Sequence, residues 1–236
     1  MKTYFYNRTI YRVIKDIDLP NCFLDIDDFY DNKFDNITNA LKNPFVIHTE
    51  NMCKRMGNVD FYAYIISEEF KNKANMFESA ILISSYLIGY FSSCKSFLDS
   101  IAIALSDIYK LDLSNKQKDF GKNVFWKKIV HAEPSTTDRY HKYEDIYDEI
   151  IFWRDSSIHR VSPLVMVHTS GPPENTPKEM QSIKLLAEPD QFGFEFNSKS
   201  NKWCDVLELH HKWRPAFINL CENVLSDIKN NLGKLK

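Results

Sequence analysis

Arg154, Asp155 and His159 place a guanidinium, a carboxylate and an imidazole close together near the end of one predicted helix. An imidazole can move protons near neutral pH, and a guanidinium can hold a phosphate group through two hydrogen bonds. Asp155 and His159 are four residues apart and share a helical face, so Asp155 could accept a hydrogen bond from the His159 ring. The pattern predicts charged and hydrogen-bonding groups held rigidly at the end of a helix, where they could do chemistry. The simpler interpretation is an ion pair at a helix end, where cationic side chains are favourable.

The stretch from Tyr140 to Pro163 is predicted to be the helix that holds these groups. Its apolar residues recur every three or four positions, namely Tyr143, Ile146, Tyr147, Ile150, Ile151, Trp153 and Ile158. Pro163 marks the end, because a proline disfavours helical geometry in the residue before it. In an ideal helix Arg154 lies about 140° around the axis from His159. Arg154 would therefore reach His159 through its length, through a distorted turn, or from a second copy of the chain.

A longer helix is predicted from Asn75 to Leu111 and would form the spine of the core. The stretch contains no proline and a sustained apolar stripe, and it would be about 50 Å long. A polar line through its middle, comprising Ser92, Ser96, Asp99 and Ser100, could face a cleft. The closing segment, Trp203 to Leu232, is predicted to be another amphipathic helix with Pro215 inside it.

The densest positive cluster falls on a predicted helix from Lys116 to His131. Lys122, Lys127 and Lys128 belong to this cluster. A solvated helix face is the ordinary interpretation of such a run, and a surface that contacts phosphates is the alternative. Arg160, directly after His159, could add to such a surface.

The remaining segments have mixed signals. Residues 1–20 suggest a strand or two, residues 25–43 a helix ended by Pro44, and residues 51–58 a loop, while residues 61–70 could be a helix or a strand. Residues 164–168, 182–187 and 192–196 suggest strands of a small β insertion at about 163–197. We expect an irregular extension over 1–72, packed on a helical domain over 73–236.

Composition excludes several classes of function. The chain has 236 residues, 44% of them hydrophobic, and a net charge of −2, which is typical of a soluble globular protein without a global field for nucleic acid. The five cysteines form no C-x-x-C pair, so neither a disulfide framework nor a zinc site is indicated. The most hydrophobic run, residues 80–91, is too short to span a bilayer, and the N-terminus lacks an apolar signal core. We expect a cytoplasmic protein without metal, cofactor or membrane partner.

The order of these elements resembles the HEPN superfamily. The resemblance lies in the long apolar helix carrying FLDSIAIALSDIYKL, a further helical hairpin, and a helix ending in RDSSIH, which matches the R-x(4–6)-H motif of that family. Asp155 stands directly after Arg154, where the family often has a polar residue. The resemblance covers roughly residues 75–160 and the closing helix.

The resemblance implies a mainly α-helical bundle that forms a homodimer with two motifs facing one cleft. It also implies a metal-independent endoribonuclease of a defence or toxin–antitoxin type, with RNA as substrate and an antitoxin or regulatory protein as partner. Arg154, Asp155 and His159 would be the catalytic residues, and Asp99 and Ser96 would support them. The alternative is a HEPN-like module that binds nucleic acid or protein without cleaving.

Overall fold

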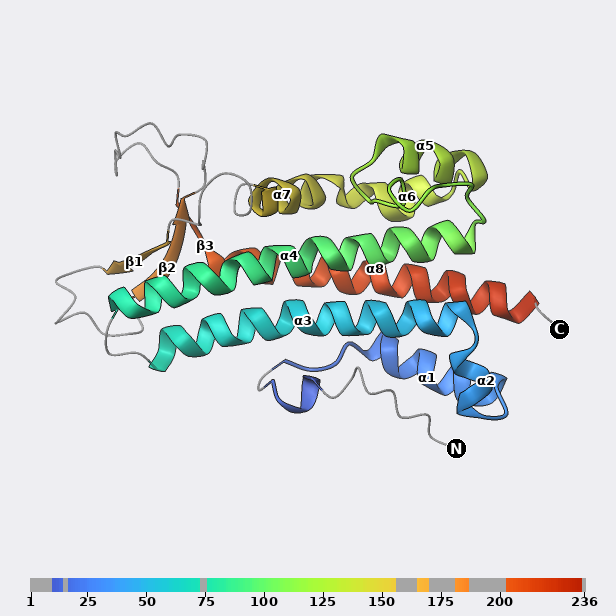
Figure 1. Cartoon of the computed structure of the whole chain (residues 1–236), viewed down its shortest axis with the longest axis horizontal. Coiled ribbons are helices and arrows are strands. Elements are labelled where there is room, and N and C mark those ends of the chain that lie inside the picture. Colours follow the sequence, from blue (N-terminus) through green and yellow to red (C-terminus); the bar gives the residue numbers. More distant parts are fainter. Residues whose placement is uncertain are drawn as a thin grey trace.

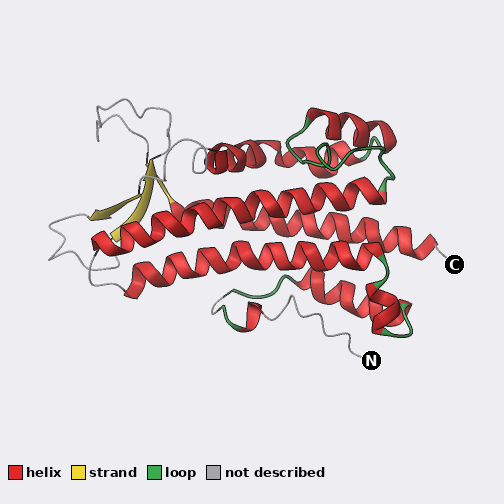
Figure 2. Cartoon of the chain, viewed as in Figure 1, coloured by secondary structure: helices red, strands yellow, loops and turns green. Residues whose placement is uncertain are grey.

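The structure is a computed structural model, and it describes residues 10–14, 17–72, 76–155, 165–169, 181–186 and 203–234. The protein is mainly α-helical (Figures 1 and 2). Its helices are α1 (Asn21–Lys33), α2 (Ile37–Leu41), α3 (Pro44–Asn72), α4 (Met76–Ile108), α5 (Asn123–Ala132), α6 (Thr136–Tyr140), the short 3₁₀ helix η2 (His141–Tyr143), α7 (Glu144–Asp155) and α8 (Val206–Lys234). The strands are β1 (Val165–Thr169), β2 (Gln181–Leu186) and β3 (Trp203–Asp205).

Helix α4 is the centre of the fold. It packs most extensively along α3, and α7 and α8 cover other parts of its surface (Figure 1). Its apolar stripe is buried, as Leu87, Phe91, Cys94, Ile101 and Leu105 are all inaccessible to solvent. The predicted spine helix and the predicted closing helix are therefore confirmed, because their long apolar periodicity matches the faces that the bundle buries.

Helix α3 differs from what the sequence suggested. The prediction of a loop over residues 51–58 is wrong, and Pro44 begins this helix instead of ending a preceding one. Proline is well suited to the first helical turn, where its missing N–H needs no partner. The apolar period was hidden because Thr49, Glu50 and Asp60 are buried on the same face as the apolar residues. Residues 44–72 consequently share one hydrophobic core with α4 instead of forming an irregular extension.

The N-terminal segment and α5 also depart from expectation. Residues 10–12 form a short 3₁₀ helix instead of a strand, and the Val13 and Ile14 N–H groups donate to the Ile10 carbonyl. The rest of the strand prediction within residues 1–9 lies outside the described residues. Helix α5 begins at Asn123, not Lys116. Side chains of the preceding segment favour turns, since Gln117 accepts from the Ser114 N–H at 2.9 Å.

The three strands form one antiparallel sheet in the order β1-β2-β3, and Val165 lies opposite Leu185 in its register. Strands β1 and β2 match two of the predicted strands. The third predicted strand, residues 192–196, lies outside the described residues. Strand β3 occupies residues 203–205, where the closing helix was expected to begin. The sheet therefore leads directly into α8.

By length and composition, residues 81–108 of α4 could also cross a membrane. The most hydrophobic run of the sequence, residues 80–91, covers only part of this stretch. Core helices of bundles pass the same test, and the buried face of α4 contacts α3, α7 and α8. We accordingly describe α4 as a core helix.

Candidate functional site

Helix α7 carries the candidate centre and is firmly attached to the bundle. Tyr147, Ile150 and Trp153 are buried, and the Trp153 ring stacks on Phe91 of α4 with centroids 5.7 Å apart. On another side, Glu149 accepts hydrogen bonds from the Trp213 indole at 2.7 Å and from the Lys212 ammonium at 2.8 Å. Both partners belong to α8. The end of α7 is thus positioned by contacts to two long helices.

Arg154 and Asp155 form the last turn of α7. The Arg154 guanidinium donates to the Asp155 carboxylate at 2.7 Å, and the two side chains are 33% and 49% exposed. The sequence had placed the Asp155 carboxylate beside His159. His159 and Arg160 lie outside the described residues, so the predicted contact between Asp155 and His159 stays a prediction.

Asp99 and Ser96 of α4 lie in a different part of the bundle. Lys95 donates to Asp99 and, at 3.0 Å, to Asp119. The Ser96 carbonyl accepts from Arg55 of α3 at 3.2 Å. Burial raises the pKa of Asp99, and the bond from Lys95 opposes that shift.

The structure does not bring this pair to Arg154. Trp153, next to Arg154, contacts Phe91, and Asp99 is eight residues further along α4, which corresponds to about 12 Å. Lys95, which the sequence analysis did not single out, ties the turn before α5 to α4 through Asp119. Asp99 belongs to this ion-pair group and is separate from the candidate centre.

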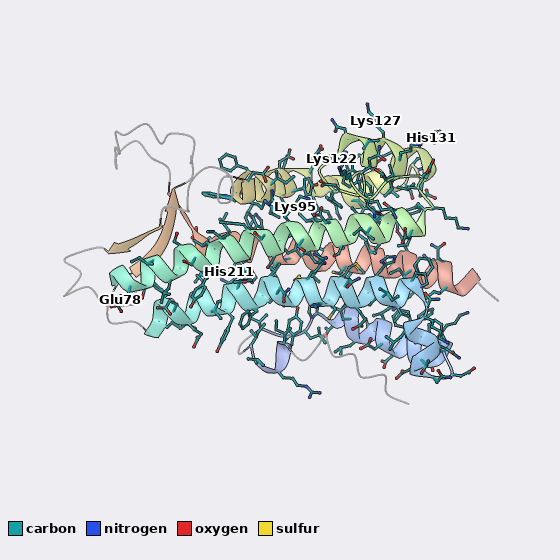
Figure 3. The ribbon with its side chains drawn as sticks, in the orientation of Figure 1. Glu78, Lys95, Lys122, Lys127, His131 and His211 are labelled. Carbon is teal, nitrogen blue, oxygen red and sulfur yellow. The ribbon has the colours of Figure 1, made fainter. Side chains whose placement is uncertain are left out.

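The predicted basic residues of α5 are exposed. Lys127 and His131 lie on the outer side of α5 (Figure 3), Lys128 is exposed as well, and Lys122 is exposed directly before the helix begins. The helix is held by its buried face, where the Trp126 indole donates to the Phe120 carbonyl at 2.8 Å. The lysines therefore form a surface on a fixed helix.

The chain directly before Lys122 lies beside Tyr147, two turns of α7 before Arg154. A Cβ added to Gly121, beside Lys122, would stand 2.9 Å from the Tyr147 hydroxyl. Tyr147 is seven residues before Arg154, or about 10 Å along the helix. A single-stranded nucleic acid running along α7 could contact both regions through different phosphates.

A buried polar network was missed by sequence reasoning. Asp60 of α3 is completely buried and accepts from the Arg214 guanidinium at 3.0 and 3.2 Å and from the Tyr11 hydroxyl at 3.1 Å. Arg214 also donates to the carbonyl of Asp18 at 2.8 Å. Burial raises the pKa of Asp60, and Arg214 opposes the shift. The network joins α3, α8 and the N-terminal segment.

His210 of α8 borders this network. Its Nδ1 lies 3.2 Å from the Tyr90 hydroxyl, and its Nε2 lies 3.6 Å from Asp60 and has no hydrogen-bond partner among the described residues. Burial first, then Arg214 and His211, lower the pKa of His210 to about 3. His210 is therefore neutral at pH 7, and its contact with Asp60 is not an ion pair.

The His210 environment predicts acid sensitivity. The unfolded chain binds a proton at His210 below a pKa of about 6.5, whereas the folded protein resists protonation down to about 3. The contribution of the neutral His210 side chain to the free energy of unfolding is fully present above pH 6.5. It is lost as the pH falls toward 3, by up to about 1.4 kcal/mol per pH unit.

Urea unfolding of wild type, His210→Gln and His131→Gln between pH 7 and pH 4 measures this effect. We expect the His210→Gln protein to lose less stability on acidification than wild type, and the His131→Gln protein to follow wild type because His131 is exposed on α5. Equal slopes for wild type and His210→Gln would contradict the assignment.

A second network fixes α8 to the α6 region. Asp227 accepts from the Tyr109 and Tyr140 hydroxyls, each at 2.7 Å, and pairs with Arg139. Burial, reinforced by Asp227, raises the pKa of Tyr140 far above its ordinary value. All of these donors are satisfied, so we interpret the network as structural.

Metal ligands do not gather in the described part of the chain, where no group of three or more His, Cys, Asp or Glu side chains could hold an ion. Cys22, Cys53, Cys94 and Cys221 are buried and carry free thiols. Burial raises the pKa of Cys22 to about 12, so this thiol is a poor nucleophile at neutral pH.

Comparison with known proteins adds no assignment. No protein-family model matches the chain, and neither curated proteins nor solved structures give a match.

Proposed function

We propose that this protein is a metal-independent endoribonuclease of a defence or toxin–antitoxin type, built on a HEPN-like helical bundle and acting as a cytoplasmic homodimer. The observation that supports the proposal is the position of Arg154. This guanidinium stands at the end of a helix anchored to both α4 and α8, five positions before His159 in the sequence. A cation on an anchored helix, with a histidine close to it in the sequence, suits cleavage of a phosphodiester.

The proposed reaction uses the RNA itself as nucleophile. The 2′-hydroxyl attacks the adjacent phosphorus, the bond to the 5′-oxygen breaks, and a 2′,3′-cyclic phosphate and a 5′-hydroxyl are formed. His159 moves a proton from the 2′-hydroxyl or to the leaving oxygen, and Arg154 stabilises the charge that builds on the phosphate oxygens. The two copies of a dimer would together supply groups that one helix holds on different faces.

The exposed lysines on and directly before α5 would bind phosphates of the RNA strand at a distance from the scissile bond. Lys127 and Lys128 are exposed on a helix fixed by its buried face, Lys122 is exposed directly before that helix, and each could neutralise one phosphate. Arg160 would contribute a further positive charge in the same role. This arrangement favours a polynucleotide over a mononucleotide.

One observation favours a non-catalytic alternative. The outward side of α7 carries the exposed carboxylates of Glu144, Asp145 and Asp148, and Asp155 is paired with Arg154. These charges repel phosphates, and the pair could act as a structural clasp. In that case the protein would be a HEPN-like interaction module, and replacing Arg154 would lower stability without affecting RNA.

Expression in a bacterial host separates the two functions. The ribonuclease proposal predicts that wild-type protein arrests growth and that His159→Ala protein, made at the same level, does not. His131→Ala, which changes an exposed histidine of α5, serves as the matched control and should remain toxic. Normal growth with all three soluble proteins would favour the interaction module.

A further inference from the structure

Phe152 of α7 is the most exposed aromatic side chain in the described part of the chain, at 37%. Its ring meets the buried Trp153 ring edge-on, with centroids 5.7 Å apart. Trp153 is in turn held by its stack on Phe91. Phe152 therefore presents an aromatic surface on a rigid support, two residues before Arg154.

The neighbours of Phe152 on the same side of α7 are acidic. Asp148 precedes it by four residues and Asp155 follows it by three, so both lie beside it on the helix surface. The Asp155 carboxylate accepts from Arg154. Asp148 is exposed and is a hydrogen-bond acceptor next to the ring.

The Phe152 ring and the carboxylates of Asp148 and Asp155 favour contact with the base of a nucleotide over contact with its phosphate. The carboxylates repel the phosphate backbone, and the aromatic ring attracts the flat face of a base. Bases stack on aromatic side chains with little regard to sequence, and a carboxylate accepts well from the amino group of cytosine. Uracil offers a carbonyl oxygen at that position, which a carboxylate repels.

We propose that Phe152 is the stacking platform for a nucleobase of the RNA substrate, next to the phosphate held by Arg154, and that Asp148 accepts from the amino group of that base. The inference rests on the proposed function for the identity of the ligand. It assigns a base-binding position, with cytosine preferred to uracil, on the outer side of α7.

Equilibrium binding tests the platform without relying on cleavage. The probe is a fluorescent 2′-O-methyl oligoribonucleotide of about eight nucleotides, which cannot be cleaved because its 2′-hydroxyls are blocked. Phe152→Leu keeps an apolar side chain without a ring, and Phe152→Trp keeps a ring. We expect Phe152→Leu to weaken binding by about 10-fold and Phe152→Trp to change it by less than about 3-fold. Equal binding by wild type and Phe152→Leu would overturn the platform.

Base preference tests the role of Asp148. Wild type should bind a cytosine-rich probe more tightly than a uracil-rich probe, and Asp148→Asn should reduce the difference, because an amide offers a donor as well as an acceptor. An unchanged preference in Asp148→Asn would overturn this part of the proposal. Thermal unfolding of each variant should match that of wild type, since both side chains are exposed.

Cleavage of unmodified RNA by wild type, measured in parallel, separates the two proposals. Cleavage together with unchanged binding by Phe152→Leu would overturn the platform and leave the ribonuclease proposal intact. Binding that depends on Phe152 without any cleavage would support the platform and overturn the ribonuclease proposal. Absence of any binding to wild type would overturn the platform.

Discussion

Replacing Asp60 with alanine is expected to lower the free energy of unfolding by about 3–5 kcal/mol. The carboxylate is completely buried and receives three hydrogen bonds, two from Arg214 and one from Tyr11. Its removal leaves the guanidinium of a largely buried arginine without its carboxylate partner. The loss of a charge inside a buried pair costs far more than the loss of an exposed ion pair.

Urea unfolding at pH 7 measures the Asp60 effect. Asp112→Ala, an exposed substitution, is the control and should change stability by less than about 0.5 kcal/mol. The double variant Asp60→Ala with Arg214→Ala should lose less than the sum of the single variants, because neither charge is left unpaired. A change below about 1 kcal/mol in Asp60→Ala would show that the network does not hold α3, α8 and the N-terminal segment together.

Replacing Arg154 with alanine is expected to reduce the rate of RNA cleavage by about 100- to 1,000-fold, the effect of removing one group that stabilises transition-state charge. Arg154→Lys should recover only part of the rate, because an ammonium cannot form the paired hydrogen bonds of a guanidinium. Both proteins should remain folded, since the Arg154 side chain is 33% exposed and its ion pair with Asp155 is partly exposed as well.

Single-turnover cleavage with circular dichroism of each variant measures the Arg154 effect. If a folded Arg154→Ala protein cleaves as fast as wild type, this guanidinium does not take part in catalysis. A protein that has lost its helical structure would instead support the structural clasp of the alternative function. Lys71→Ala, an exposed lysine on α3, provides the control for a general loss of positive charge.

The long helices could be predicted from the sequence, but α3 could not. Helices α4 and α8 have unbroken apolar stripes, which periodicity detects directly. In α3 the same stripe is interrupted by Asp60 and Thr49, whose burial depends on partners elsewhere. Asp60 pairs with Arg214, 154 positions away, and no local pattern indicates such a pair. The helical structure of this segment therefore depends on tertiary contacts that local sequence patterns do not reveal.

The candidate site could likewise be predicted from the sequence only in part. The anchoring of α7 through Tyr147, Ile150 and Trp153 follows from helical spacing. The pairing of Arg154 with Asp155 does not, because adjacent side chains on a helix point about 100° apart and the guanidinium reaches the neighbouring carboxylate only through the length of the arginine side chain. The contact of Asp155 with His159 stays a prediction, because His159 lies outside the described residues.

Cleavage of total RNA and a defined tRNA pool in EDTA, by wild type and His159→Ala side by side, tests the central claim most directly. The account predicts cleavage by wild type that leaves 2′,3′-cyclic phosphate ends, and a loss of about 100-fold or more in His159→Ala, as expected for a proton-transfer group. Wild-type cleavage by a folded His159→Ala protein, or no cleavage by a folded and dimeric wild type, would contradict it.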